Sequence, residues 1–475
     1  MELFLPTLNT GITNIDRAFR IAIGDFTGNI VHHCSGLLES PQPVIIAGLD
    51  YVRPWTRDAA FNTWYAGGLL CPETARNTLL AVLCRYPKLR IDGQYWDAII
   101  WAQGAWSYYT YTGDHDFLKI AQEAIENSLR YFEETEFDTK DGLFRGGACF
   151  QDGIAAYPNK FVSSHNGSGI MSCIRDNPDF LAPVGGKIPT KAMSTNCLYY
   201  MAYKIAENIR KELSQPELNS CAIKAKKLKD AINTHFWNSP KGTYRYLLDT
   251  EDTTDRQEGL GHAFAILSGV ASKEQYDEIM HNQFITPNGI ACVWPQYERY
   301  SSFSENGFAR HSGTIWPQVN TAWAKACIQA GYPEKGWNEL KSLADKACRD
   351  KQFVEIYHPL SGEPYGGLQE SPEANGITEW ESCNRQTWCA TGYINMVISV
   401  LFGMKFNSNG IDFKPFLPEK MITISLKGLK YRRQILDITI SKGGNEKFIE
   451  INGSKSKMLK LEADGTGRKE IIINI

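Results

Sequence analysis

Apolar residues recur at helical spacing along most of the chain as far as Phe402. Ile15, Phe19 and Phe26, for example, fall on one face of a predicted helix that runs from about 14 to 31. Pro72 suits the first turn of a helix, and Gly113 suits the position just after a helix ends. The pattern predicts twelve helices, which begin near positions 14, 56, 72, 96, 115, 190, 217, 258, 272, 312, 334 and 385.

The connections between these helices alternate between short and long. Short links join helices two and three, four and five, six and seven, eight and nine, and ten and eleven, and the remaining links are longer. A short link makes its two helices antiparallel neighbours, so all the long loops meet at one rim. The even-numbered helices begin at that rim and form an inner ring. The sequence therefore predicts an (α/α)6 barrel. The alternative is an α-solenoid, but no fixed-period repeat is visible.

The pattern changes after the last predicted helix. Segments such as MITISLKGLKYRRQILDITISKG and KEIIINI alternate apolar and polar residues and are separated by Gly-Gly, Asn-Gly and Asp-Gly turns. We therefore predict two domains, a barrel over residues 1–404 and a small β-sandwich over residues 405–475, with a structural role for the second.

Composition and charge narrow the function. A net charge of -3 and the absence of a basic run exclude a nucleic-acid surface, and no apolar run is long enough to cross a membrane. The 12 cysteines are scattered without the spacing of a metal site, so we expect reduced thiols, no metal and no cofactor. This favours a cytoplasmic location, or a periplasmic one if a signal peptide has been removed. The sequence leaves the oligomeric state open.

Polar clusters lie in the long loops and at the starts of the even-numbered helices. Taken singly, each has a structural explanation: Asp58 and Asp97 suit the first turns of helices, Asp152-Gly153 suits a turn, and His311 suits the core. The predicted fold, however, places all of these clusters on one rim of the barrel. Because independent structural roles would not require this, we expect the clusters to form a functional site. The clusters are RPWTRDAAF (53–61), DGQYWD (92–97), FQDG (150–153), ARHSGTIWP (309–317) and the acid-rich segment 351–383.

Two carboxyl groups between aromatic side chains point to glycoside hydrolysis. One carboxyl must be protonated to donate to the leaving oxygen, and the other must be ionised to activate water or to attack. Asp152 lies between Phe150 and Ile154, apolar surroundings that can raise the pKa of a carboxyl group, so it suits the acid. Glu355, near the start of the acid-rich segment, is the candidate base.

The chain resembles the six-hairpin (α/α)6 glycosidases, a clan that includes the glucosidase domain of glycogen debranching enzyme, neutral invertases, processing α-glucosidases and mannosylglycerate hydrolase-like enzymes. WTRDAAF is similar to the clan's segment that holds sugar hydroxyls, which implicates Arg57 and Asp58. FQDGIAAYP resembles the general-acid segment and implies that Asp152 is the acid. FVEIYHPLSGEP resembles the base segment and implies that Glu355 is the base.

RHSGTIWPQVN is similar to the start of an inner helix in that clan and points to His311 and Trp316 as substrate contacts. Excess tryptophan and tyrosine is common on surfaces that stack sugars. We therefore add Trp55, Trp96, Asp97 and Trp380 from these clusters to the predicted substrate-binding set, together with Trp388 from the helix that follows the acid-rich segment.

The chain departs from the clan in two loops, 159–187 and 363–383, which are both longer than expected. The second loop contains Glu370, Glu379 and Glu381, and either Glu379 or Glu381 is an alternative base. Because these insertions fall where specificity is set, the resemblance does not transfer the identity of the sugar.

Most members of the clan that the chain resembles are inverting, so the resemblance implies an exo-acting, inverting glycoside hydrolase, with a small α-glucoside as the first candidate substrate. An α-L-rhamnosidase or α-mannosidase would use the same barrel and the same paired acids. A phosphorylase would need a basic cluster that the loop around Glu355 does not offer. A non-catalytic sugar-binding protein would not need opposed carboxyl groups, and an epimerase or isomerase would need pocket-facing histidines, for which His262 and His311 are the candidates.

Overall fold

The computed structural model describes residues 2–85, 87–93, 96–149, 153–162, 169–170, 188–216, 219–249, 254–371, 376–443 and 446–475. The predicted acid Asp152 lies outside these described residues, as does most of the insertion at 159–187.

Six helices form a closed inner ring, in which each helix packs against the next and the last returns to the first. Helices that are apolar around most of their surface are expected to be buried on all sides, and every residue of the sixth helix is buried. The ring consists, in order, of α2 (Thr56–Asn62), α5 (Ala98–Thr112), α9 (Met193–Glu212), α11 (Gly259–Ser268), α14 (Pro317–Ala330) and α16 (Thr387–Met396). A π-helical turn η1 (Thr63–Gly67) and α3 (Gly68–Leu70) prolong the first helix, and η5 (Val397–Leu401) prolongs the sixth.

A second set of helices packs around this ring. These outer helices are amphipathic; in α15, for example, Leu340, Leu343 and Ala347 are buried and face the ring. The set consists of α1 (Thr13–Gly28), α4 (Pro72–Ala81), α6 (His115–Thr135), α10 (Asn219–Phe236), α12 (Lys273–Asn282) and α15 (Pro333–Asp350). The arrangement confirms the predicted (α/α)6 barrel of twelve helices with a C-terminal β region.

Tight turns connect inner to outer helices at one end of the barrel. Gly113 and Gly331 end α5 and α14 in the left-handed conformation, with φ of 72° and 94°, which glycine adopts without steric cost. Pro72 and Pro333 then begin the outer helices α4 and α15. The N-termini of the inner helices therefore gather at the opposite end, where the long loops lie.

The C-terminal strands form two sheets. The larger has the order β1-β18-β19-β23-β20-β21, with β19 and β23 parallel and the other pairs antiparallel. Its strands are β1 (Thr7–Asn9), β18 (Thr423–Tyr431), β19 (Gln434–Ser441), β20 (Phe448–Ile451), β21 (Ser454–Ser456) and β23 (Gly467–Asn474). The smaller consists of β16 (Met404–Asn407), β17 (Gly410–Phe413) and β22 (Lys460–Glu462). The edge strand β1 comes from the start of the chain, and the division at 404/405 stays a prediction.

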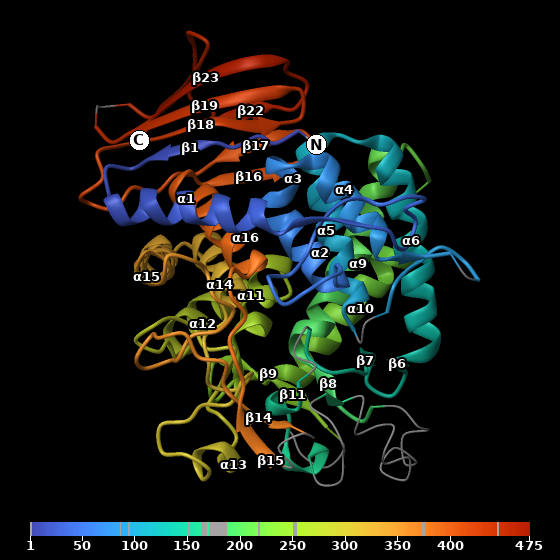
Figure 1. The fold of residues 1–475 in the computed structure, drawn as a ribbon. Helices are drawn as coiled ribbons and strands as arrows, with labels where there is room; N and C mark the ends of the chain where they lie inside the picture. Colours follow the sequence, from blue (N-terminus) through green and yellow to red (C-terminus); the bar gives the residue numbers. More distant parts are fainter. Residues whose placement is uncertain are drawn as a thin grey trace.

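Short two-stranded sheets and short helices lie in the long loops at the rim. In Figure 1, β14, β15 and α13 lie at the end of the molecule away from the C-terminal sheets. The strands are β2 (Ile30–His33), β3 (Gln42–Ile45), β4 (Leu83–Cys84), β5 (Arg90–Ile91), β6 (Phe137–Asp138), β7 (Leu143–Phe144), β8 (Lys191–Ala192), β9 (Trp237–Asn238), β10 (Thr243–Tyr244), β11 (Leu247–Leu248), β12 (Gln257–Glu258), β13 (Val293–Trp294), β14 (Leu368–Ser371) and β15 (Gly376–Glu379). The short helices are η2 (Ile154–Ala156), η3 (Asn159–Phe161) and α13 (Glu298–Ser301).

The tenth helix begins later than the sequence predicts. The pattern places its start at Ser312, but α14 begins at Pro317, because Ile315 is paired with Tyr357 in an antiparallel β-bridge. The indole nitrogen of Trp316 also donates to the Arg310 carbonyl at 2.7 Å. The segment before α14 is therefore a turn followed by a bridged residue, and it lies against the segment that carries Glu355.

Two further observations concern the described part of the chain. None of its helices is long and apolar enough to cross a membrane, and none of its His, Cys, Asp and Glu side chains form a group of three that could hold a metal ion. Eleven of its cysteines are free thiols. The cytoplasmic location stays a prediction of the sequence.

Candidate active site

Glu355 is buried at the rim and is held by a positively charged partner. Its Oε2 lies 2.8 Å from Nη2 of Arg310, and the hydroxyl of Tyr51 lies 3.5 Å from its Oε1. The Glu355 side chain is 4% exposed and that of Arg310 is 12% exposed, so the pair is shielded from most of the solvent. These two contacts hold the Glu355 carboxylate in a fixed position at the rim.

The charge of Glu355 also acts on its neighbour Tyr51. The Glu355 carboxylate, then burial, then the Asp58 carboxylate raise the pKa of the Tyr51 hydroxyl far above its ordinary value. Tyr51 is therefore a neutral hydrogen-bond donor, and Glu355 and Asp58 both lie close to its hydroxyl group. This contact links the base candidate to the sugar-binding candidates on α2.

Arg310 connects Glu355 to the hairpin β14–β15. Its Nη1 donates to the carbonyl oxygens of Gly366 and Glu381 at 2.9 and 3.1 Å, and its backbone N–H donates to Leu368. The guanidinium group lies 5.5 Å from the ring centroids of both Trp316 and Trp380, within cation–π range. A single arginine thus fixes the carboxylate and the inserted hairpin together.

A second ion pair joins the starts of two inner helices. Nη1 of Arg57 lies 2.6 Å from Asp97 Oδ2, its Nε lies 3.9 Å from Asp58 Oδ2, and its guanidinium group lies over the ring of Trp55. Asp97 precedes α5 without accepting a side-chain capping bond, so capping does not explain this carboxylate. The structure therefore brings together Trp55, Arg57, Asp58 and Asp97 in one group.

His311 is a neutral imidazole in the middle of the rim. Burial first, and then the charges of Arg310 and Arg57, lower its pKa well below the ordinary value. Its ring stacks on Trp316, with ring centroids 4.9 Å apart and an interplanar angle of 20°. Trp316 in turn meets Trp388 edge to face at 6.1 Å. Both tryptophans are almost fully buried, whereas Trp55 and Trp380 are partly exposed.

Gly153, the residue after the predicted acid, packs directly against this group. A Cβ atom at Gly153 would lie 2.3 Å from Cε1 of His311 and 2.5 Å from Oε1 of Gln369, distances that exclude any side chain without rearrangement. The described chain next to Asp152 therefore lies against His311, whose neighbour Arg310 binds Glu355. Trp96 supports the same region, because it belongs to a small apolar cluster with Ile154 and Tyr157.

The other acids of the inserted loop are placed differently from Glu355. Glu379 is exposed on β15, opposite Leu368, and Glu381 is also exposed. Glu370 is buried, with Oε1 3.0 Å from Nε of Arg299 and Oε2 2.5 Å from the hydroxyl of Tyr300. Of these acids, Glu355 alone pairs with Arg310 in the described part of the structure.

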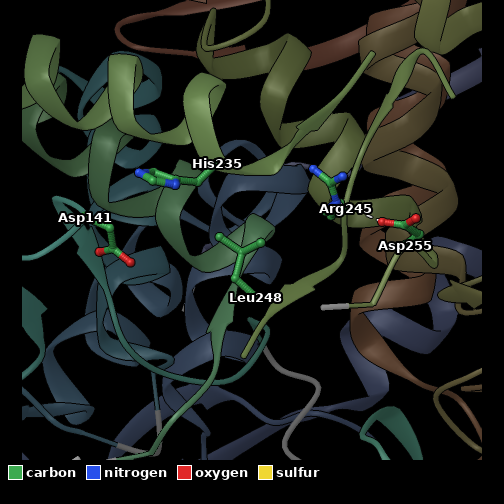
Figure 2. Close-up of a pocket in the computed structure, with 5 residues that line it drawn as sticks. All are labelled: Asp141, His235, Arg245, Leu248 and Asp255. Atoms are coloured by element: carbon green, nitrogen blue, oxygen red, sulfur yellow. Dashed lines mark hydrogen bonds and ion pairs between the residues drawn. The ribbon is translucent and has the colours of Figure 1, made fainter. Parts of the chain in front are cut away.

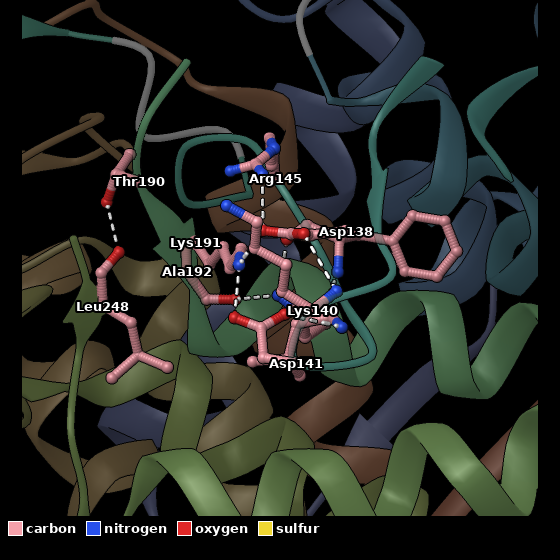
Figure 3. A network of polar contacts seen from close by, with 11 residues as sticks. Asp138, Lys140, Asp141, Arg145, Thr190, Lys191, Ala192 and Leu248 are labelled. Atoms are coloured by element: carbon pink, nitrogen blue, oxygen red, sulfur yellow. Dashed lines mark hydrogen bonds and ion pairs between the residues drawn. The ribbon is translucent and has the colours of Figure 1, made fainter. Parts of the chain in front are cut away.

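A buried polar network anchors the chain that leads toward residue 152. Nζ of Lys191 contacts Asp138 Oδ2 at 2.7 Å and also contacts Asp141, while Arg145 contacts Asp138, as Figure 3 shows. Burial opposes the charge on Asp138, but hydrogen bonds from Lys191 and from the backbone of Lys140, with the charges of Lys191 and Arg145, outweigh it and lower its pKa. The network ties the hairpin β6–β7 to the start of α9.

A separate open pocket of about 560 Å³ lies beside this network (Figure 2). Its lining consists of Asp141, His235, Arg245, Leu248 and Asp255, and within it Nε of Arg245 pairs with Asp255 at 2.8 Å. None of the predicted site residues that the structure describes is among these lining residues, so this pocket is distinct from the group around Glu355.

Glu258 is a buried acid that the sequence analysis did not single out. It immediately precedes the inner helix α11 and accepts a hydrogen bond from the backbone N–H of Ser194 at 3.1 Å. Burial raises its pKa to about 8, so the group is protonated at neutral pH. The Ser194 hydroxyl accepts from the backbone of Cys149, close to the predicted acid segment.

Sequence reasoning also missed the roles of Tyr51, Arg299 and Arg310. Arg310 stands next to His311 in the motif that was singled out, so its charge was a visible signal. Tyr51 and Arg299 give no local signal, because their partners are 304 and 71 residues away. His262, a candidate for an isomerase site, is buried, and its ring nitrogens contact the side chain of Gln283 and, at 2.9 Å, the Tyr244 carbonyl.

The fold and the site together form a closed double ring of helices that carries buried carboxylates, arginines and tryptophans at one rim. A model of the mannosylglycerate hydrolase MGH1-like glycoside hydrolase domain matches residues 98–373, more than half of the chain. The chain therefore belongs to the MGH1-like glycoside hydrolase family. No curated protein sequence matches it.

Solved structures with the same fold include a sialidase, with a TM-score of 0.65 and 13% identity over 90% of this chain. They also include a GH78 rhamnosidase from a Bacillus species (TM-score 0.59, 14% identity, 100% of this chain). A GH63 mannosylglycerate hydrolase from Thermus thermophilus, in complex with Tris, matches with a TM-score of 0.57 and 11% identity over 80% of this chain and 99% of its own. This chain spans 37% of the sialidase and 44% of the rhamnosidase.

Proposed function

We propose that the chain is an exo-acting, inverting glycoside hydrolase of small α-glycosides, with Glu355 as the general base. The observation that carries this proposal is the buried contact of 2.8 Å between Arg310 and the Glu355 carboxylate. A general base must be held in position to accept a proton from water, and the guanidinium group of Arg310 holds this carboxylate through a charge-assisted contact. The exposed Glu379 has no comparable support and is the weaker candidate.

Asp152 is the proposed general acid. Its support is indirect, since it rests on the contact of the adjacent Gly153 with His311 and on the resemblance of FQDGIAAYP to the acid segment. An inverting mechanism requires the two carboxyl groups to lie roughly 6.5–9.5 Å apart, with room for a water molecule, whereas retention requires about 5–5.5 Å. We therefore expect Asp152 and Glu355 to face each other across a water-sized gap.

The proposed substrate-binding residues lie at the same rim as Glu355. Arg57, Asp58 and Asp97 supply charged hydrogen-bonding groups for sugar hydroxyls, and the partly exposed rings of Trp55 and Trp380 supply stacking faces. The buried residues Trp96, His311, Trp316 and Trp388 act mainly by supporting these groups.

An α-glucoside is the first candidate substrate, and an α-mannoside is the second. A solved structure of a GH63 mannosylglycerate hydrolase in complex with glucose supports a glucoside. The name of the family model, which is that of a mannosylglycerate hydrolase, supports a mannoside. The structural similarity to a rhamnosidase makes an α-L-rhamnoside a third candidate substrate. An epimerase is disfavoured because His262 is occupied by protein partners within the core.

The test is a panel of 4-nitrophenyl α-D-glucoside, α-D-mannoside and α-L-rhamnoside, with disaccharides of the same sugars and the product anomer read by NMR. Release of the β-anomer from an α-glycoside supports inversion, whereas release of the α-anomer overturns it. Glu355→Gln should abolish turnover, and Glu379→Gln should leave it nearly unchanged. The reverse result would transfer the base role to Glu379.

Asp152→Asn provides the matching test of the acid. It should abolish turnover of unactivated disaccharides but retain turnover of the α-glycosyl fluoride, since fluoride leaves without a proton donor. Undiminished disaccharide turnover would remove Asp152 from the acid role. Absence of turnover across the panel, combined with measurable sugar binding, would favour a non-catalytic sugar-binding protein.

A further inference from the structure

Arg299, on the short helix α13, donates to the chain that follows Asp152. Its Nη1 donates to the Tyr157 carbonyl at 2.9 Å and to Asn159 Oδ1 at 3.0 Å, and its Nη2 donates to the Ile154 carbonyl at 3.0 Å. The residues 154–159 thus receive three hydrogen bonds from one guanidinium group. This segment is thereby fixed to α13.

The remaining two donors of Arg299 point to the inserted hairpin and to its own helix. Nε contacts Glu370 Oε1 on β14 at 3.0 Å, and Nη2 contacts the hydroxyl of Tyr300 at 3.0 Å. Tyr300 closes the cluster by donating to Glu370 Oε2 at 2.5 Å. The five N–H donors of the guanidinium group are therefore all engaged, and both oxygens of Glu370 are engaged as well.

The same hairpin is tied to Glu355. Leu368, two residues before Glu370, donates to the Phe308 carbonyl and accepts from the backbone N–H of Arg310, both at 2.8 Å. Arg310 then pairs with Glu355. Beneath these polar contacts, Ala155, Tyr300 and Leu368 belong to one small apolar cluster, so the connection is also packed.

We propose that Arg299 is a positioning residue that sets the separation between the acid segment and the base. It binds the segment after Asp152 on one side and, through Glu370 and the hairpin β14–β15, the Arg310–Glu355 pair on the other. The inference rests on the proposed roles of Asp152 and Glu355. It assigns the inserted hairpin a role beyond covering the site: the hairpin is the rigid link between the two catalytic carboxyl groups.

The chemistry of the position requires arginine. A lysine at 299 has three donors on a single atom, so it can make at most three of these five hydrogen bonds, whereas the planar fork of arginine makes all five. A displacement of about 1 Å in a catalytic group can lower the rate about 100-fold. We therefore expect Arg299→Lys to lower kcat for an unactivated disaccharide by about 10- to 100-fold, with a smaller change in KM.

The experiment compares two substrates of the sugar that the panel selects, the disaccharide and the α-glycosyl fluoride. Displacement of the acid segment slows the disaccharide reaction, which needs a proton donor, more than the fluoride reaction. Arg256→Lys is the matched control, because Arg256 stacks on Tyr297 at 4.0 Å, and its hydrogen bonds go to Pro295 and Thr254 instead of the acid segment. The control should leave both rates within about 2-fold.

Several outcomes decide the matter. Equal loss on both substrates, or no loss in a folded Arg299→Lys variant, would contradict the positioning role. A loss in Arg299→Lys that persists in full in an Asp152→Asn background would contradict it as well, since the two changes should not be additive. If Asp152→Asn itself has no effect, the proposed function fails instead, so the two failures are distinguishable.

A milder variant protects the test against misfolding. Asn159 is exposed and accepts one of the five hydrogen bonds, so Asn159→Ala should fold normally and lower the disaccharide rate by a factor of about 2 to 10. Thermal unfolding of both variants shows whether the protein is folded at the assay temperature. An Asn159→Ala variant that matches the parent on both substrates would count against the proposal.

Discussion

Arg310 and Glu355 form an ion pair of 2.8 Å across 45 residues of sequence, between the segment before α14 and the acid-rich loop. Removing one partner of a buried pair is costly, because the remaining charge has lost its compensation. We expect Arg310→Met to lower the free energy of unfolding by about 3–5 kcal/mol.

The same variant should also lose activity, because the Glu355 carboxylate would no longer be held in position by its charged partner. Chemical denaturation and steady-state measurement of kcat/KM check the two effects. Arg310→Lys keeps the charge but loses the fork to Gly366 and Glu381, so it should be intermediate. Wild-type stability in Arg310→Met would show that the pair is not energetically coupled.

Gly153→Ala tests the close approach of the acid segment to His311. The added methyl group would overlap Cε1 of His311 and Oε1 of Gln369, so we expect a loss of about 1–3 kcal/mol in stability and a large fall in activity. Gly24→Ala, on the exposed face of α1 with no neighbour within 4 Å, is the control. It should stabilise the protein by about 0.4–1 kcal/mol. Comparable effects at the two positions would show that the contact between Gly153 and His311 has little energetic importance.

Glu258→Gln tests the buried acid at the start of α11. Because burial raises its pKa from 4.5 to about 8, the native state holds a proton that the unfolded state releases between these pH values. The contribution to stability is therefore complete below pH 4.5 and is lost as the pH rises to 8, at about 1.4 kcal/mol per pH unit. Glutamine retains the acceptor for Ser194, so the variant should show a flatter dependence of unfolding free energy on pH. If the unfolding free energies of wild type and Glu258→Gln depended on pH in the same way, the raised pKa of Glu258 would be refuted.

Lys191→Met tests the network that anchors the chain before residue 152. The variant leaves Asp138 and Asp141 without their shared cation in a largely buried position, so we expect a loss of about 3–5 kcal/mol at pH 7. The pKa of Asp138 is lowered in the folded protein, so this stabilisation is present above its ordinary value of 3.8 and fades as the pH falls below it. Lys119→Met, in an exposed pair with Asp116, is the control and should leave the unfolding curve nearly unchanged. Denaturation curves at pH 7 and at lower pH measure both effects.

Helical periodicity and loop length carried the prediction of the barrel. Pro72, Gly113 and Pro333 mark helix ends through their own backbone preferences, which act locally, so the sequence displays them directly. The predicted start of α14 is too early because the residues before Pro317 form a turn, and Ile315 pairs with Tyr357, which is distant in the chain. Tertiary pairing there overrides a helical pattern.

The sequence by itself determined the helical barrel, the β-rich tail and a short list of rim residues, because periodicity, turn residues and motifs are local properties. The tertiary structure alone decided which acid of the loop pairs with Arg310, since Glu355, Glu370 and Glu379 look alike in sequence and differ in burial and partners. It likewise revealed the contacts of Arg299 and the protonated state of Glu258. Burial and long-range contacts set the charge of a carboxyl group, and neither is written in the neighbouring residues.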